Sequence, residues 1–147
     1  MSTSVEVTAS KGRSALLRAV GIGLVVGVAQ ASAPFAFWWV PPATVYAMSI
    51  AFIATVYIGF AVADGRRIVV IVEAAVATLF IVVAALGVTG SPWLLVAGFF
   101  AHGSKDLWQH RTGFVRGTRW WPPFCAAVDW VAAGILAAAI LAGWGGR

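Results

Sequence analysis

The sequence contains few charged residues and few residues of the types that usually carry redox or metal chemistry. Only 10% of its 147 residues are charged, and it has five acidic residues, two histidines and one cysteine. A single cysteine excludes a disulfide within the chain. With 61% hydrophobic residues, the apolar surface is too large to be hidden in a water-soluble core. We therefore expect the chain to lie in a lipid bilayer.

The motifs of common soluble catalytic domains are also missing. The sequence has no GxSxG, no phosphate-binding loop, no CxxC and no HExxH pattern, and it shows no convincing internal repeat. A net charge of +5 could indicate a nucleic-acid partner, but in so apolar a chain basic residues more plausibly set the membrane orientation. We expect no nucleic-acid binding.

Five apolar runs each have close to the roughly 20 residues that cross about 30 Å of hydrocarbon. The predicted fold is an all-α membrane protein, a compact bundle of five transmembrane helices. We expect one domain, residues 15–147, after a disordered cytoplasmic tail, residues 1–14. The predicted spans are residues 15–38, 43–63, 68–89, 92–110 and 122–144.

The basic residues predict the orientation of these spans. Of the ten lysines and arginines, only Arg147 falls on the far side of the bundle, and the loops 39–42 and 89–91 carry no charge. The positive-inside rule then places the N-terminus in the cytoplasm and the C-terminus outside. This topology predicts a multi-pass protein of the cell (plasma) membrane.

The first run has a second interpretation, a secretory signal. Basic residues, GIGLVVGVA and the small residues 31–33 resemble such a signal and its cleavage site. Pro34 directly after that site disfavours cleavage, and the apolar run continues through Trp38. We therefore expect an uncleaved helix that Pro34 kinks near its outer end. Gly23 and Gly27 form a GxxxG pair, which allows another helix to approach closely.

His102, Asp106 and His110 recur at every fourth position of HGSKDLWQH. Residues four apart on a helix lie about 40° apart around its axis, so we expect these side chains to share a face and converge. Glu73 and Asp129 lie a few residues into the third and fifth spans from the same side. The sequence thus predicts a layer of acids and imidazoles in the cytoplasmic leaflet.

This layer predicts a metal site. An ionisable residue inside a bilayer costs a few kcal/mol, so it implies a partner or a function. Imidazole and carboxylate together suit zinc or iron, and helix bundles bind metals with inward-facing Glu and His. An open position on the ion would activate water or bind oxygen, with a lipid or other apolar molecule arriving laterally as substrate. The predicted ligands are His102, Asp106, His110, Asp129 and Glu73, and the last two have general base as an alternative role.

Two alternatives use the same residues. In the first, the acids are protonated hydrogen-bonding groups that hold together a non-catalytic membrane subunit. In the second, they line a proton or ion pathway. Cys125 lies one turn before Asp129 and offers a soft ligand, although free cysteine usually just packs in apolar surroundings. Lys105 or Arg111 would bind anionic head groups. The sequence leaves the choice between enzyme, subunit and pathway open, as well as the metal and the oligomeric state.

The motif HGSKDLWQH, followed after a basic, proline-containing loop by CAAVD, resembles the HxxxDxxxH and CxxxD pair of a family of small, uncharacterised bacterial integral membrane proteins. The resemblance covers roughly residues 92–140, about a third of the chain, and implies no activity. A fainter similarity concerns the intramembrane metal hydrolases of the ceramidase and adiponectin-receptor type. The chain has too few spans and lacks their full ligand set, so that similarity is an analogy only.

Overall fold

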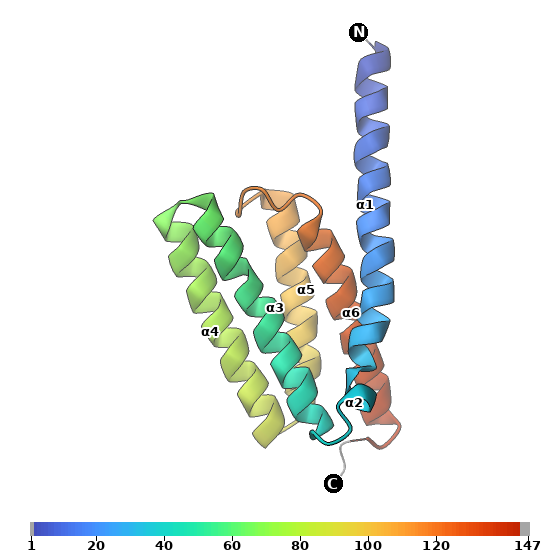
Figure 1. The fold of residues 1–147 in the computed structure, drawn as a ribbon, viewed down its shortest axis with the longest axis vertical. Coiled ribbons are helices and arrows are strands. Elements are labelled where there is room, and N and C mark those ends of the chain that lie inside the picture. Colours follow the sequence, from blue (N-terminus) through green and yellow to red (C-terminus); the bar gives the residue numbers. More distant parts are fainter. Residues whose placement is uncertain (1, 145–147) are drawn as a thin grey trace.

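The structure is a computed structural model that describes residues 2–144, and within residues 2–11 only the backbone is described. The predicted disordered tail, residues 1–14, falls largely on that segment and stays a prediction. All regular structure in the described residues is helical, and five of the six helices are long. Figure 1 shows the long helices side by side. The helices are α1 (Ser2–Ala31), α2 (Ala33–Ala36), α3 (Pro42–Asp64), α4 (Arg67–Thr89), α5 (Trp93–Thr112) and α6 (Trp121–Leu141).

Four of these helices are long and apolar enough to cross a membrane, namely Gly12–Ala31 of α1, α3, α4 and α6. Large apolar side chains also point outward, with Val25, Phe52 and Leu141 each more than 70% exposed. Such a surface favours contact with lipid over water. The fold is therefore that of a helical membrane protein.

α5 does not have the composition of an apolar span, because it carries Lys105, Asp106 and Arg111. Its place in the bundle is nevertheless central, since it packs against α3, α4 and α6. Figure 1 shows that α4 ends at the opposite end of the bundle from the start of α6. The 20 residues of α5 connect those two ends.

The first predicted span ends earlier than expected. The sequence predicts one helix to residue 38, whereas α1 stops at Ala31 and the four-residue α2 follows. The reason is Pro34, which has no N–H to donate to the carbonyl of Gln30. It lies instead in the first turn of α2, where that bond is not needed. The predicted kink is thus a break between α1 and α2. At the end of α1, the carbonyl of Ala31 accepts a hydrogen bond of 2.7 Å from the Tyr46 hydroxyl.

α1 lies at the edge of the bundle and packs along α6. A Cβ added at Gly23 would lie 2.5 Å from the carbonyl oxygen of Phe124, and one added at Gly27 would lie 2.8 Å from Cβ of Val131. No side chain fits at either position without moving the helices apart. The predicted close approach at this GxxxG pair is confirmed.

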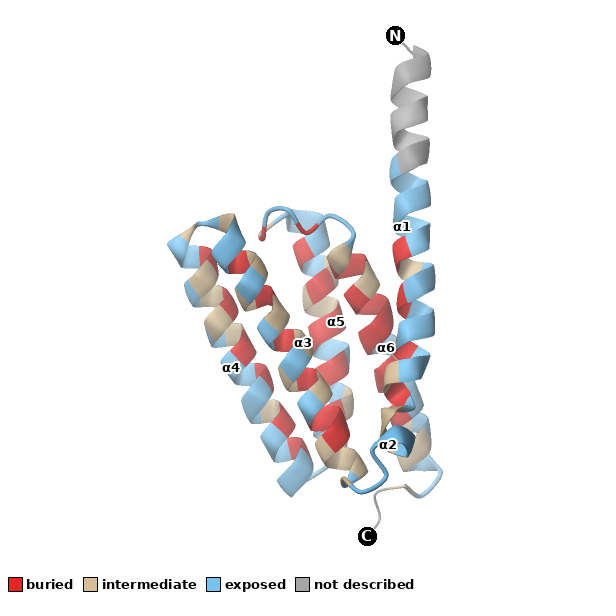
Figure 2. Ribbon diagram, viewed as in Figure 1, coloured by how far each residue is buried: buried red, intermediate tan, exposed pale blue. Residues whose placement is uncertain are grey.

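The apolar core is divided into two parts along the bundle. The larger part includes Ala77 of α4, and the smaller one includes Val69. Glu73 lies one turn from each of them on the same buried face of α4. Figure 2 shows buried residues gathered on the facing sides of α3, α4, α5 and α6. A polar layer therefore separates two apolar clusters.

Two loops are joined at the end of the bundle nearest this layer. The side chain of Asp64 is fully buried and pairs with Arg66 at 2.5 Å. Arg66 donates to the carbonyl of Phe114 at 2.6 Å, and the Arg116 N–H donates to Asp64 at 2.8 Å. The hydrogen bond to Asp64 raises the pKa of the Arg66 guanidinium above its usual value. These bonds hold the loop after α5 against the α3–α4 turn.

Candidate metal centre

α5 supplies most of the polar layer from one helix face. His102, Asp106 and Gln109 are at most 1% exposed, and they stand at positions i, i+4 and i+7. Seven residues are almost two turns, so the third side chain lies only about 20° from the first. Lys105, at i+3, lies at the edge of the same face, with 13% of its side chain exposed. This spacing directs all four side chains into the bundle.

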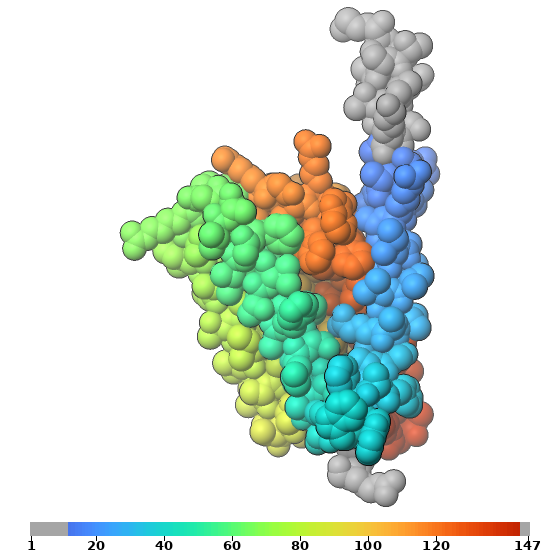
Figure 3. Space-filling view, viewed as in Figure 1, coloured from blue at the N-terminus to red at the C-terminus, as the bar shows by residue number. Residues whose placement is uncertain are grey.

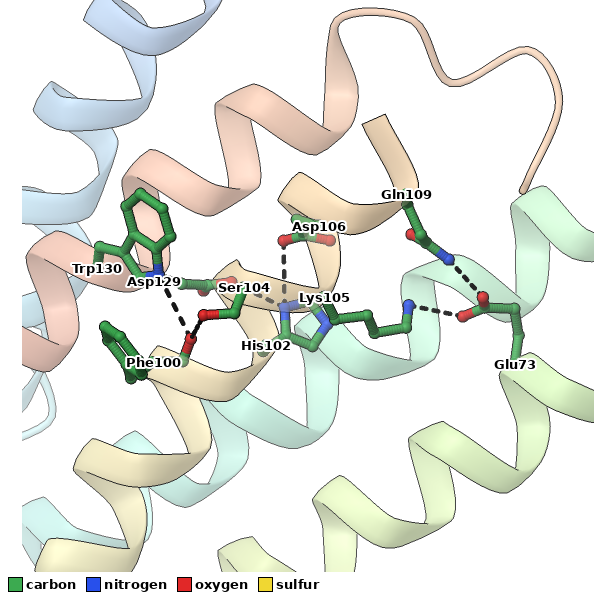
Figure 4. A network of polar contacts seen from close by, with 9 residues as sticks. All are labelled: Glu73, Phe100, His102, Ser104, Lys105, Asp106, Gln109, Asp129 and Trp130. Carbon is green, nitrogen blue, oxygen red and sulfur yellow. Dashed lines mark hydrogen bonds and ion pairs between the residues drawn. The ribbon is translucent and has the colours of Figure 1, made fainter. Parts of the chain in front are cut away.

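Three donor groups converge between α5 and α6. Nδ1 of His102 lies 2.7 Å from Oδ2 of Asp129 and 3.3 Å from Oδ2 of Asp106. One donor atom from each residue lies within 4.8 Å of the others, and all three residues are 0% exposed. Figure 4 shows both carboxylates beside the imidazole. We call His102, Asp106 and Asp129 the triad.

Glu73, one of the predicted ligands, lies beside the triad but binds other partners. One carboxylate oxygen accepts a hydrogen bond from Nζ of Lys105 at 2.7 Å, and the other accepts one from Nε2 of Gln109. Nζ of Lys105 also lies 3.8 Å from the centre of the Tyr57 ring. The Glu73 charge is therefore balanced within its own pair, as Figure 4 shows.

His110, also a predicted ligand, does not join this group. It is exposed near the end of α5, whereas its neighbour Gln109 is buried. Two steps of four residues rotate a side chain by about 80°, which carries His110 off the buried face. The expectation that all three members of the stripe converge is wrong for this residue. The sequence analysis missed Gln109 as the third buried polar residue of this face. An i, i+4, i+7 spacing that starts at His102 would have identified it.

Close packing of α5 on α6 brings Asp129 to His102. A Cβ added at Gly103 would lie 2.8 Å from the Trp130 ring and 3.2 Å from the Ala126 carbonyl oxygen. Only glycine therefore allows this approach next to His102. Cys125 is buried one turn before Asp129 but lies outside the triad. Its packing role, the ordinary one for a free cysteine, agrees with this position.

Aromatic rings enclose the imidazole from the other side. The His102 ring centroid lies 5.0 Å from that of Phe80 on α4 and 6.0 Å from that of Tyr57 on α3. The triad is thus held in surroundings where charge is poorly solvated. Several of its polar atoms nevertheless lack a hydrogen-bond partner among the described residues. They are Nε2 of His102, both carboxylate oxygens of Asp106 and Oδ1 of Asp129.

No family model matches the chain, and no curated protein or solved structure is significantly similar to it. Evidence on function therefore has to come from the chemistry of this site.

Proposed function

We propose that the chain is a multi-pass protein of the plasma membrane that binds a divalent metal ion, zinc or iron, at His102, Asp106 and Asp129. The proposed ion activates a small molecule for reaction with a lipid or another apolar substrate. The triad geometry supports this proposal, because an imidazole and two carboxylates are ligands that both metals accept.

The charge of the polar layer is the observation that carries the proposal. Glu73, Asp106 and Asp129 bring three negative charges when ionised, and Lys105 brings one positive charge. With His102 neutral, the form in which an imidazole binds a metal, the layer carries an excess of two negative charges. Such an excess is expensive away from water. One divalent cation at the triad would balance it, and its preference for carboxylate oxygen would also satisfy the unpartnered oxygens of Asp106.

The ligand count supports a reactive role for the ion. Three protein ligands leave a fourth position for water or substrate, as in catalytic rather than structural zinc sites. A bound ion would supply Lewis acidity at that position. Other residues of the chain would hold the ligands of the ion in position. Glu73, Lys105 and Gln109 hold one another and fix the face of α5 from which His102 and Asp106 project.

We also propose that α5 is a fifth span, with the N-terminus in the cytoplasm and the C-terminus outside. The two charged residues in the interior of α5 lie beside partners, because Lys105 pairs with Glu73 and Asp106 lies beside His102. Paired charges inside a bundle are the form in which membrane helices tolerate them. A 20-residue helix also rises about 30 Å, the thickness of the hydrocarbon.

Metal analysis of protein purified without chelators tests the site. We expect about one zinc or iron ion per wild-type chain and loss of that ion in His102→Ala and in Asp129→Asn. His110→Ala is the matched control, because it removes the same side chain from the same helix outside the triad. It should keep the ion.

Folding has to be separated from binding in this experiment. Each variant is therefore also examined by size-exclusion chromatography and thermal unfolding in detergent. A folded wild-type protein without metal, or a folded His102→Ala protein with the wild-type content, contradicts the proposal. The first result would favour the non-catalytic subunit or the proton pathway, which need no ion.

A further inference from the structure

A cavity of about 200 Å³ lies next to the triad, between α1, α3 and α6. Its walls are mostly apolar and include Val26, Phe52, Val56 and Phe124. In Figure 3 the chain near the start of α6 is visible between α3 and α1 on this face. Since liquid water occupies about 30 Å³ per molecule, the cavity has room for several small groups.

Two residues that line this cavity carry buried polar atoms without a partner among the described residues. Asp129 is 0% exposed, and its Oδ1 has no hydrogen-bond partner among the described residues. Nε2 of Gln30 is likewise buried without a partner there. Both residues line the cavity, one from α6 and the other from α1. The residues that line the cavity thus include one with a free acceptor atom, on α6, and one with a free donor atom, on α1.

This pair of groups selects the chemistry of a ligand. A hydroxyl can donate to Asp129 and accept from Gln30 at the same time. A carboxylate or phosphate in its fully ionised form has no hydrogen to donate to Asp129, and among the described residues no cationic side chain lines the cavity to bind it. An ammonium group has no lone pair to accept from Gln30. A neutral hydroxyl therefore fits best.

The surroundings of the cavity fit an alkyl chain. A second cavity, of about 440 Å³, runs between α2 and α3, and Phe52 lines both. Its other walls are apolar, including Phe37, Val45 and Met48, except at Ser49. Large exposed side chains such as Phe52, at 71%, place this side of α3 against lipid. A chain entering from the bilayer would lie along α3 with its head beside Asp129.

We propose that this cavity binds a long-chain alcohol, with the hydroxyl between Gln30 and Asp129 and the alkyl chain along α3. The inference rests on the proposed function, whose apolar substrate it assigns to a chemical class. It places the hydroxyl of that substrate at Oδ1 of Asp129. The other oxygen of this carboxylate, Oδ2, lies 2.7 Å from Nδ1 of His102.

Photocrosslinking to purified full-length protein in lipid nanodiscs tests this assignment. The probe is hexadecanol with a diazirine on its alkyl chain, and the crosslinked peptides are identified by mass spectrometry. We expect crosslinks on α1, α3 and α6 that excess hexadecanol removes. Hexadecanoic acid and hexadecylamine should compete at least roughly fivefold less well, the effect of about one hydrogen bond.

Two variants locate the binding. Val56→Phe fills the cavity and should abolish the crosslinks. Val62→Phe makes the same change on the same helix at a side chain that is 63% exposed, and it should crosslink like the wild type. Gln30→Leu keeps the approximate volume and removes the donor. It should lower alcohol crosslinking roughly fivefold and remove the preference over the amine.

Equal competition by the acid, wild-type crosslinking of Val56→Phe, or no specific crosslinks would overturn the proposal. Metal content is measured in the same preparations. Metal without alcohol-specific crosslinks means that the cavity assignment fails while the proposed function stands. Alcohol-specific crosslinks without metal mean the reverse.

Discussion

Individual side chains in the polar layer divide into two groups with different roles. Glu73 has all its charge balanced by Lys105 and a further hydrogen bond from Gln109, which makes it a positioning group. Asp129 and Asp106 share one imidazole and keep unpartnered oxygens, which makes them available to a cation. The two groups predict different responses to substitution. Changes at Glu73 should lower stability, and changes at Asp106 or Asp129 should lower metal content.

The Glu73–Lys105 pair gives the stability prediction at this scale. Lys105→Met leaves the Glu73 carboxylate buried with only an amide partner. Loss of one member of a buried pair typically costs about 3 kcal/mol of unfolding free energy or more. Adding Glu73→Leu removes the orphaned charge as well, so the double variant should regain most of that loss.

Thermal unfolding in detergent measures both effects. Arg111→Met is the control, because it makes the same change at an exposed position of α5 and should unfold like the wild type. A double variant that is less stable than Lys105→Met would show that the pair is not the source of the loss.

The helices set which of these side chains can meet. α1 is held by its contact with α6, and this contact depends on Gly23 and Gly27. It also forms one wall of the cavity beside Asp129, through Val26 and Gln30. The two glycines thus connect helix packing to the shape of the proposed ligand site.

Gly27→Ile is therefore expected to push α1 away from α6. Overpacking of this kind costs about 2 kcal/mol, which should appear as a lower unfolding temperature in detergent. Gly21→Ile is the matched control, since a Cβ at Gly21 meets nothing within 4 Å. Equal unfolding temperatures for the two variants would show that close packing at Gly27 contributes little.

Sequence patterns identified the helical class and the residues of the triad, because apolar runs and rare buried charges are local signals. They did not show which residues the buried polar side chains pair with. Taking every fourth residue selected His110, whereas helix rotation over seven residues selects Gln109. Glu73 looked like a ligand by depth alone, but Lys105, one turn of α5 after His102, neutralises it. Depth in the membrane can be read from a sequence, while the choice between neighbouring partners depends on packing.

The whole molecule raises the question of how many times the chain crosses the membrane. α3, α4 and α6 each have the length and composition of a span, and consecutive long helices run in opposite directions in Figure 1. The end of α4 and the start of α6 therefore lie at opposite ends of the bundle. If both helices cross, α5 has to return through the same thickness.

Cysteine labelling in intact cells tests this topology. In a Cys125→Ala background, Ser91→Cys and Arg116→Cys each place one thiol at an exposed position flanking α5. We expect a membrane-impermeant maleimide to label Ser91→Cys in intact cells, because the proposed topology places the uncharged loop 89–91 outside. Arg116→Cys should be labelled only after permeabilisation, because the positive-inside rule places the basic loop after α5 in the cytoplasm. Labelling of both from the same side would show that α5 does not cross, and the reversed pattern would invert the orientation. Only the expected pattern places the triad in the cytoplasmic half of the membrane, where its ion would be drawn from the cell interior.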